Sequence, residues 1–239
     1  MIHSHKYQFL LDTDFEIYLW YNLLMKFSIG GIVPLTCIDF PGCIACVIFS
    51  QFCPLRCDYC HNPHLLGATG AKYSIDYLFH FLEKRKNFLE GVVFSGGEPF
   101  AQPDIISVLQ QVKDLGFKVA VHTSGFYTEK FQEALNIVDW VGLDIKAEKG
   151  EYEQITHAKE SGERAFNSLA ILLKSCVDYE VRTTIYPYFF NKEKILSLAK
   201  VLQNLNVKNY VLQEYRAIHE KEKPTTLKSI INDRDVNTL

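Results

Sequence analysis

The sequence predicts an α/β fold built on a parallel sheet, which is either doubly wound or curved into an incomplete barrel. Short apolar runs, with the length of buried strands, alternate with segments whose apolar residues recur at helical spacing. Six such runs occur in series, and strands that alternate with helices favour a parallel sheet with right-handed crossovers. The polar motifs follow the ends of these runs, where both kinds of fold place their chemistry.

Six strands are expected, and the first is the most clearly marked. Residues 43–50 read Cys-Ile-Ala-Cys-Val-Ile-Phe-Ser, a nearly continuous apolar run that is typical of a buried strand. The other five are expected at residues 91–95, 118–122, 138–145, 180–186 and 207–215.

Helices are expected between these strands. Ser74 can cap the first helix, whose apolar face is formed by Ile75, Leu78, Phe79 and Leu82. The second helix begins near Pro103 and ends before Gly116. Further helices are expected at residues 128–135, 164–174 and 192–205.

Residues 28–216 are expected to form a single core domain, followed by a charged, peripheral tail at residues 217–239. Residues 1–27 form an N-terminal extension with two open interpretations. Either Met25 is the natural start and residues 1–24 are a translated upstream stretch, or the chain carries an additional N-terminal helix.

The N-terminal extension does not resemble a membrane span or a signal peptide. The apolar stretch at residues 17–24 is preceded by Asp12, Asp14 and Glu16, and it is too short to cross a bilayer. The extension also lacks the basic start and the small-residue cleavage site of a secretory signal. We therefore expect a cytoplasmic protein without a membrane partner, whose cysteines are reduced thiols or metal ligands.

The composition excludes two further classes of protein. The chain has 239 residues, 48% of them apolar, and a formal net charge of −3. This apolar content with so little net charge is incompatible with intrinsic disorder. A nucleic-acid partner is not expected either, because there is no basic excess to neutralise phosphates.

The cysteines are the main functional clue. Seven are present, and six of them lie between Cys37 and Cys60. Cys53, Cys57 and Cys60 have the spacing C-x3-C-x2-C in a short segment that follows the first expected strand. Three thiolates in one loop can bind one metal centre.

The other cysteines are expected to be packing residues. Cys43 and Cys46 fall within one expected strand, where residues three apart point to opposite faces and cannot readily reach one ion. Both are better interpreted as small apolar residues. Cys37 and Cys176 are also expected to pack in the protein, so no disulfide is required.

Two metal centres fit the cysteine loop. A structural zinc ion would take His61 as its fourth ligand, because such sites are filled entirely by the protein. A [4Fe–4S] cluster held by three cysteines leaves one iron open to a small molecule. The loop lies at the catalytic edge of the fold, which favours the cluster over zinc.

Several motifs together resemble one family. Ile38-Asp39-Phe40-Pro41-Gly42, the C-x3-C-x2-C loop and Cys57-Asp58-Tyr59-Cys60-His61-Asn62-Pro63 are similar to the glycyl-radical-enzyme activating branch of the radical S-adenosylmethionine (SAM) enzymes. Within that branch the chain is most similar to activating proteins of anaerobic ribonucleoside-triphosphate reductase, of the pyruvate formate-lyase activase type. The resemblance covers roughly residues 28–216, and it implies a partial (β/α)6 barrel.

The resemblance implies a set of cofactor-binding residues beside the three cluster cysteines. In Ser95-Gly96-Gly97-Glu98-Pro99, the glycines allow the backbone to approach a ligand, and Glu98 can accept hydrogen bonds from the methionine ammonium group. Without the resemblance, this segment could be an ordinary strand-to-helix turn. The other residues expected to contact the cofactors are Tyr59 against the adenine, His61, Thr123, Ser124, Asp144, Lys146, Arg182 and Gln213.

The alternation of a strand places Asp144 and Lys146 on one face, where a weak surface ion pair is an equally good interpretation from the sequence alone. Taken alone, Arg182 and Gln213 are also typical of solvated side chains.

Two positions depart from the family pattern. His122 replaces the acidic residue of an Asp-Thr-Asn-Gly segment that in some relatives lies near a cation, and this exchange argues against a cation site here. Phe52 precedes Cys53 where close relatives usually have glycine. If that glycine has a positive φ, phenylalanine is strained by roughly 1–3 kcal/mol.

The resemblance also implies the reaction. One [4Fe–4S] cluster on Cys53, Cys57 and Cys60 would bind SAM, and an external flavodoxin or ferredoxin would reduce it. Cleavage of SAM would give a 5′-deoxyadenosyl radical that removes a hydrogen atom from a glycine of a partner, most simply anaerobic ribonucleotide reductase. A second cluster is not expected, because no cysteine lies between Cys60 and Cys176 or after it.

Three alternatives stay open at this point. The partner could be another glycyl radical enzyme, such as a pyruvate formate-lyase. The substrate could be a small molecule, as in deazapurine synthesis. The protein could also be a zinc-binding interaction protein without enzymatic activity.

Overall fold

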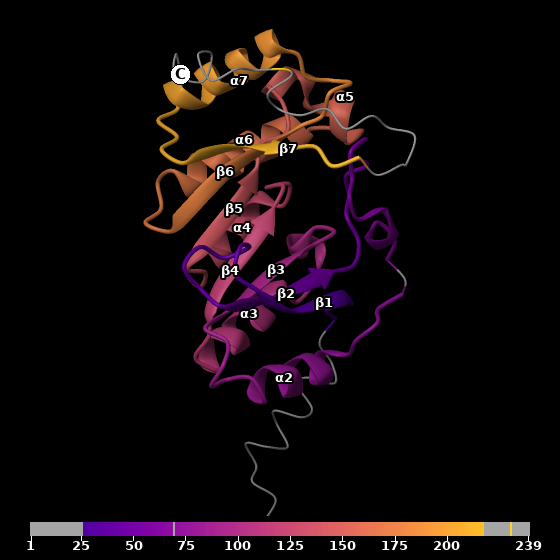
Figure 1. Cartoon of the computed structure of the whole chain (residues 1–239), viewed down its shortest axis with the longest axis vertical. Coiled ribbons are helices and arrows are strands. Elements are labelled where there is room, and N and C mark those ends of the chain that lie inside the picture. The colour runs from indigo at the N-terminus through magenta and orange to yellow at the C-terminus, as the bar shows by residue number, and fades with distance from the viewer. Residues whose placement is uncertain (1–25, 69, 218–229, 231–239) are drawn as a thin grey trace, which may run out of the picture.

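The computed structural model describes residues 26–68, 70–217 and residue 230. Nearly all of the N-terminal extension and of the tail therefore lies outside the described residues, and the domain boundaries stay a prediction. The described part contains one seven-stranded sheet in which every strand pairs with its neighbours in sequence. The strands follow one another across the molecule from β1 to β7, with α2 and α7 at opposite ends (Figure 1).

The sheet is parallel except at its first strand. The strands are β1 (Ile29–Thr36), β2 (Ala45–Ser50), β3 (Gly91–Gly96), β4 (Lys118–Thr123), β5 (Trp140–Asp144), β6 (Asp178–Ile185) and β7 (Tyr210–Glu214). β1 runs antiparallel to β2, and the six strands from β2 to β7 are parallel. All six predicted strands are thus confirmed as β2 to β7, in agreement with a partial barrel.

β1 was not predicted from the sequence, because the composition of this strand hides its pattern. Gly30, Gly31 and Pro34 interrupt the alternation of apolar and polar residues that marks a half-buried strand. The residues from Val33 to Leu35 are exposed, as befits an edge strand. Pro34 lies where the pairing with β2 is irregular, so its missing N–H breaks no regular ladder.

The helices are α2 (Ile75–Glu83), α3 (Ile105–Asp114), α4 (Thr128–Ala134), α5 (Tyr152–Thr156), α6 (Ser161–Leu172) and α7 (Lys192–Asn204). The Ser74 side chain accepts a hydrogen bond from the Tyr77 N–H, which confirms the predicted cap. The missed helix, α5, has five residues and is too short to show a helical period.

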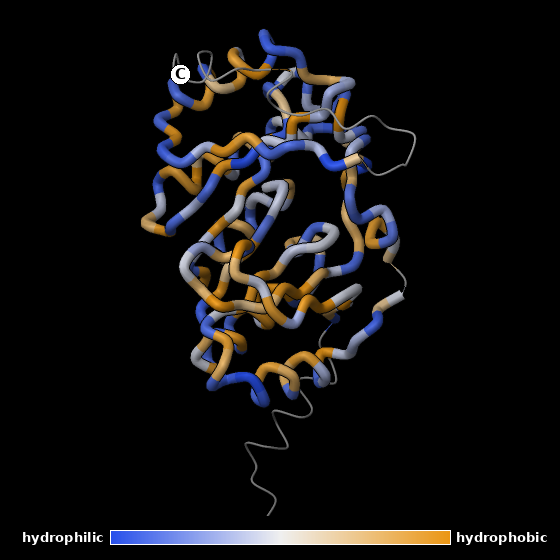
Figure 2. Tube along the Cα trace, in the orientation of Figure 1, coloured by the Kyte–Doolittle hydropathy of each residue, from blue (hydrophilic) through white to orange (hydrophobic). Residues whose placement is uncertain are grey.

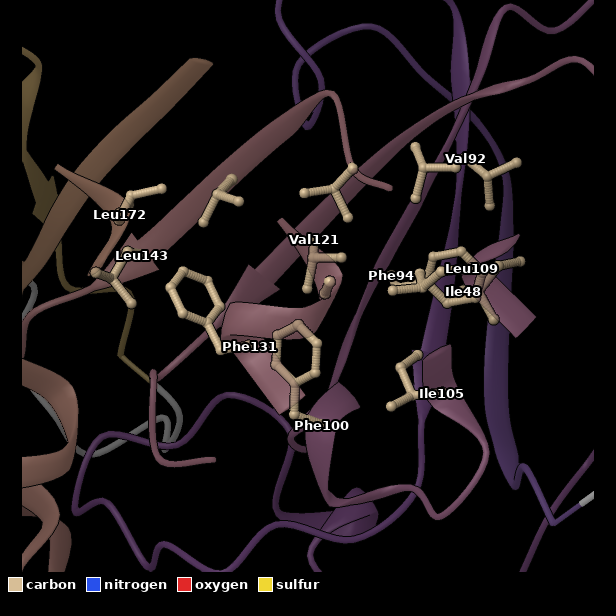
Figure 3. Close-up of a cluster of buried hydrophobic side chains, with 14 of the residues drawn as sticks. Ile48, Val92, Phe94, Phe100, Ile105, Leu109, Val121, Phe131, Leu143 and Leu172 are labelled. Atoms are coloured by element: carbon tan, nitrogen blue, oxygen red, sulfur yellow. The ribbon is translucent and has the colours of Figure 1, made fainter. Parts of the chain in front are cut away.

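The core has two layers on opposite faces of the sheet. Between the strands and the helices, Val92, Phe94, Val121 and Leu143 pack against Ile105, Leu109, Phe131 and Leu172 (Figure 3). A smaller cluster on the other face contains Phe40, Val47, Val93, Ala120 and Trp140. Figure 2 shows the matching pattern, with hydrophobic residues concentrated along the strands.

Of the four remaining cysteines, two are buried as predicted and two are exposed. Cys46 belongs to the core between the sheet and the helices, and Cys43 belongs to the smaller cluster on the other face. Their packing role and their opposite sides are thus confirmed, although Cys43 precedes β2. The prediction was wrong for Cys37 and Cys176, which are exposed. Each follows the end of a strand or helix in an irregular segment, and apolar periodicity does not report on such segments.

Within the described residues, none of the helices combines the length and apolarity that crossing a bilayer would require.

Candidate active site

One pocket of about 720 Å³ lies at the carboxyl ends of the parallel strands. Its volume is typical of a site for a cofactor of moderate size. Every residue that the sequence analysis assigned to the cluster or to SAM lines this pocket, namely Cys53, Cys57, Tyr59, Cys60, His61, Gly96, Gly97, Glu98, Thr123, Ser124, Asp144, Lys146, Arg182 and Gln213. The sheet brings them together because parallel strands end at a common edge.

The cysteine loop is held from both sides by backbone hydrogen bonds. At its beginning, the Phe52 N–H donates to the Leu65 carbonyl over 2.7 Å, and the Phe52 carbonyl accepts from the Glu98 N–H over 2.8 Å. Further along, the Arg56 N–H donates to the carbonyl of Thr156, the last residue of α5, over 2.8 Å. The loop is therefore clamped between the end of β3 and α5.

Phe52 has the positive φ that would strain any residue other than glycine, as considered from the sequence. Its φ is +70°, in the left-handed region that favours glycine. In this conformation both the N–H and the carbonyl of Phe52 are hydrogen-bonded. The carbonyl of Phe52 also lies directly against Gly97, where a Cβ atom would overlap it. The loop thus requires glycine at position 97 and tolerates strain at position 52.

The three thiols form a donor set that suits an iron–sulfur cluster. Cys53, Cys57 and Cys60 are all partly exposed toward the pocket. Burial raises the pKa of Cys53 to about 12 and also raises the pKa of Cys57, so both are neutral thiols until a metal displaces their protons. In the part of the chain that the structure describes, no three His, Cys, Asp or Glu side chains are grouped to hold a single metal ion. A cluster makes a different demand, because each thiolate binds its own iron atom.

Glu98 is completely enclosed at the end of β3. Its Oε1 accepts hydrogen bonds from the Thr123 hydroxyl (2.7 Å) and the Phe100 N–H (3.2 Å). Its Oε2 accepts from the Ser124 N–H (2.9 Å) and hydroxyl (2.6 Å). Burial raises the pKa of Glu98 in spite of these hydrogen bonds. The carboxylate therefore ties the end of β3 to the end of β4, a task that the sequence did not indicate.

A buried charge cluster joins the ends of β5 and β6. The Arg182 Nε and Nη2 donate to Asp144 Oδ1 over 3.0 and 2.9 Å, and Lys146 Nζ lies 3.3 Å from Asp144 Oδ2. Burial alone would raise the pKa of Asp144, but Arg182 and Lys146 outweigh it and lower the pKa to about 2. The alternative of an exposed surface pair is thereby excluded, since Arg182 and Lys146 are both buried.

Gly142 creates the space for the Arg182 guanidinium. A Cβ atom at position 142 would lie 2.8 Å from the guanidinium carbon, far inside normal contact. The charge cluster contains two cations, Arg182 and Lys146, and one carboxylate, Asp144, so it carries a net positive charge. Burial by itself would lower the pKa of Lys146, but Tyr59 and Asp144 raise it, and Lys146 stays charged. This corner of the pocket can attract an anionic group such as a carboxylate.

His122 completes the charge cluster as a neutral side chain. Its Nδ1 accepts from Arg182 Nη1 (3.3 Å), which assigns the proton to Nε2, and Nε2 donates to the Asp39 carbonyl (2.8 Å). Burial, together with the Arg182 charge, lowers the pKa of His122 to about 4. A neutral imidazole beside a fixed guanidinium is a poor place for a cation.

The remaining predicted residues, Tyr59, His61 and Gln213, also line the pocket. The Tyr59 ring is buried, with Lys146 Nζ 5.6 Å from its centre. His61 Nε2 lies 3.0 Å from the Arg216 carbonyl, and its ring stacks on Tyr215. The Thr184 hydroxyl donates to Gln213 Oε1 over 3.4 Å.

Several residues that line the pocket were not predicted to contact the cofactors, among them Thr184 and Asp39. Thr184 sits near the end of β6, and no motif marks it. Asp39 also lines the pocket, and its carbonyl fixes His122. The motif around Asp39 was visible in the sequence, so its place in the site could have been inferred from it.

Comparisons with known proteins agree with this geometry. Residues 47–202 match the family model described as the Radical SAM superfamily. A protein of Methanocaldococcus jannaschii named as a glycyl-radical enzyme activating enzyme is 30% identical over 198 residues, which cover 80% of this chain and 81% of that protein. A pyruvate formate-lyase-activating enzyme of Clostridium pasteurianum is 34% identical over 191 residues, covering 76% of this chain and 79% of that enzyme.

Solved structures share the fold at low sequence identity. TYW1 with a bound lysine-pyruvate adduct gives a TM-score of 0.62 at 15% identity, with 97% of this chain and 88% of that chain covered. SuiB of Streptococcus suis bound to S-adenosylmethionine gives a TM-score of 0.60 at 14% identity, with 90% and 49% covered. The chain belongs to the radical SAM superfamily, in its glycyl-radical-enzyme activating branch, whose members are enzymes that use a [4Fe–4S] cluster and SAM.

Proposed function

We propose that this enzyme installs a glycyl radical on a partner protein, and that the partner is anaerobic ribonucleotide reductase. The observation that carries the proposal is the single pocket in which the cysteine loop faces the charged ends of β5 and β6. Three of the four iron positions of a cluster are supplied by the loop, which leaves the fourth for SAM. When bound, the cluster and SAM supply a reductively generated 5′-deoxyadenosyl radical that can remove a glycine hydrogen atom.

The chain's own residues position the cofactors. Cys53, Cys57 and Cys60 hold the cluster in this proposal, and the buried positive corner at Arg182 and Lys146 receives the carboxylate of SAM. The net positive charge of that corner supports the assignment.

The end of β3 is proposed to receive the methionine end of SAM. Gly96 has a φ of +115° and no side chain, so the backbone can approach the ligand closely. Thr123 and Ser124 are fixed by Glu98 on one side of the same ligand.

Tyr59, His61 and Gln213 are proposed to hold the nucleoside end of SAM. Tyr59 presents a buried ring for the adenine, and His61 and Gln213 lie toward the ribose. Because burial raises the pKa of Tyr59, its hydroxyl stays protonated and can donate a hydrogen bond.

A pyruvate formate-lyase is the second candidate for the partner. The identity of 34% to a pyruvate formate-lyase-activating enzyme specifically favours it. In both proposals the reductant is a flavodoxin or ferredoxin and the enzyme acts in the cytoplasm.

The test is an anaerobic assay with reconstituted protein, SAM, a low-potential reductant and each candidate partner. Formation of 5′-deoxyadenosine together with a glycyl EPR signal on the reductase supports the first proposal, and a signal on the formate-lyase alone supports the second. Cleavage of SAM without a radical on either partner would refute both partner assignments.

Cysteine variants provide the internal comparison for this assay. Cys57→Ala should abolish both SAM cleavage and the EPR signal, whereas Cys176→Ser, at an exposed cysteine far along the chain, should preserve them. SAM cleavage that persists in Cys57→Ala would refute the assignment of the cluster ligands.

A further inference from the structure

A groove separate from the active-site pocket runs between β1 and α2. Its volume is about 330 Å³. Its lining residues are Ile32, Pro34, Tyr73, Tyr77, His80, Phe81, Lys84 and Arg85. None of them lines the active-site pocket, so the groove has no part in the proposed chemistry.

The floor of the groove is a ladder of stacked aromatic rings. Tyr73, Tyr77 and Phe81 are spaced one helical turn apart, with ring centres 4.9 and 6.5 Å from their neighbours. The guanidinium carbon of Arg85 lies 4.3 Å from the centre of the Phe81 ring and closes the ladder. Tyr77 is 47% exposed. Tyr77 and the partly buried Tyr73 form the open part of the ladder, whereas Phe81 is buried.

The groove is apolar at one end and basic at the other. Its charged or titratable lining groups are His80, Lys84 and Arg85, all toward the end of α2, together with the phenols of its tyrosines. Two acidic residues of the same helix, Asp76 and Glu83, do not line it. The groove therefore suits an occupant with an apolar part followed by an acidic part.

The edge of β1 beside the groove is unsuited to the addition of another strand. Its first residue, Ile29, already pairs with Tyr73. Further along, Pro34 has no N–H to donate. An occupant that binds through its side chains therefore fits this edge better than an added strand does, in agreement with the aromatic floor.

The chain itself contains a segment with the required pattern just before β1. Asp12, Asp14 and Glu16 are followed by residues 17–24, which carry no charge and include Tyr18, Trp20 and Tyr21. Counted back from β1, the apolar residues come first and the acidic residues last. This is the order in which the groove presents its aromatic rings and its basic residues.

The length of the chain allows this segment to reach the groove. Lys26 stands three residues before Ile29, which pairs with Tyr73, so it lies within about 10 Å of the aromatic end. Beside the groove, α2 (Ile75–Glu83) is about 12 Å long, at 1.5 Å per helical residue. Residues 12–24 span about 20 Å as a helix and more when extended.

We propose that residues 12–24 of this chain dock in the groove between β1 and α2, with residues 17–24 on the aromatic ladder and the acidic residues beside Lys84 and Arg85. The proposal is independent of the proposed function. It also gives the N-terminal extension a role as part of the folded protein.

Trp20 is a built-in reporter for this contact, because the chain has only one other tryptophan, Trp140, which is buried. The difference in fluorescence between the full chain and its Trp20→Phe variant, at equal cluster loading, reports on Trp20 alone. We expect blue-shifted emission that acrylamide quenches weakly.

A charge swap tests the contact with the basic end. Lys84→Glu with Arg85→Glu should shift the Trp20 emission to the red, and adding Asp12→Lys, Asp14→Lys and Glu16→Lys should restore it. Lys86→Glu, at an exposed lysine that does not line the groove, is the matched control and should change nothing.

Four results would overturn the proposal. The first is a solvent-like Trp20 emission in the unaltered chain. The second is a blue shift that survives the double reversal, which would place the segment elsewhere. The third is an equal red shift in the Lys86→Glu control. The fourth is a blue shift lost on dilution as sedimentation shows a dimer dissociating, because the groove would then hold a second copy of the chain.

Discussion

At the level of single residues, Phe52 combines a large side chain with a φ of +70°, and its backbone is hydrogen-bonded to Leu65 and Glu98. The left-handed conformation costs a non-glycine residue about 1–2 kcal/mol. The start of the cysteine loop is therefore held against a local strain.

The strain at Phe52 predicts an order of stability for two variants. Phe52→Gly and Phe52→Ala both remove the ring, but only glycine relieves the backbone. We expect the glycine variant to be more stable than the alanine variant by about 1–2 kcal/mol, measured as the free energy of unfolding in denaturant. Equal stabilities would mean that the backbone at this position is not strained in solution.

His122 predicts a pH dependence of stability. Its pKa is about 4 in the folded protein, below the value of about 6.5 in an unfolded chain. The unfolded chain therefore binds the proton more tightly, and the contribution of His122 is complete above pH 6.5 and is lost as the pH falls toward 4. The loss is on the order of 3 kcal/mol.

A variant of His122 isolates the contribution of this side chain to the pH dependence of stability. Glutamine can also donate and accept a hydrogen bond but does not titrate. Between pH 6.5 and 4 we expect the free energy of unfolding to fall less steeply in His122→Gln than in the parent. His64→Gln, at an exposed histidine, should keep the parent's slope, and identical slopes in all three proteins would contradict the assignment.

At the level of secondary-structure elements, the site depends on how strand ends contact the loops beside them. The carbonyl of Phe52 packs on Gly97, so the beginning of the cysteine loop is shaped by the end of β3. We expect Gly97→Ala to push the loop outward and to reduce the iron bound per chain after anaerobic reconstitution to well under half. Gly67→Ala, where an added methyl group meets nothing within 4 Å, should bind the parent's amount of iron.

The contact between β5 and β6 makes a second prediction at this scale. In Gly142→Ala the new methyl group displaces the Arg182 guanidinium and disrupts the positive corner of the pocket. We expect SAM to bind about tenfold more weakly, a change of about 1.4 kcal/mol measured by calorimetry. The comparison is Gly31→Ala on β1, where the methyl group makes an ordinary contact of 3.9 Å. Unchanged affinity in both variants would remove Arg182 from the SAM site.

Features that depend on a local stretch of sequence could be predicted, whereas features that depend on contacts between distant segments could not. Strands β2 to β7 were predictable because each is a local apolar run, and the motifs at their ends were local as well. β1 was not, since glycine and proline obscure its pattern.

The site depended more on contacts between distant segments. Three of the four hydrogen bonds of Glu98 join the end of β3 to the end of β4, and the space that Gly142 leaves for Arg182 joins β5 to β6. Neither arrangement has a signature in a single stretch of sequence.

At the level of the whole molecule, the cysteine loop and α5 form one mechanical unit. The Arg56 N–H and the Asp58 N–H donate to the carbonyls of Thr156 and Ile155, and Asp58 Oδ1 lies 2.7 Å from His157 Nε2. A cluster that orders the loop must therefore order α5 as well. We expect removal of the cluster by chelation to speed amide hydrogen exchange in both segments, while exchange in α3 stays constant. Faster exchange in the loop alone would show that the two segments are not coupled.

The clamp on the cysteine loop also has a consequence for biosynthesis. The three cysteines lie within eight consecutive residues, but three of the hydrogen bonds that hold their loop reach residues 155–157, about a hundred positions later. A nascent chain that has emerged only as far as Cys60 exposes the thiols without the framework that arranges them. Iron and sulfide delivered at that stage would find a cysteine loop without its hydrogen bonds to residues 155–157. We therefore expect the cluster to assemble after α5 has been translated and the chain has folded.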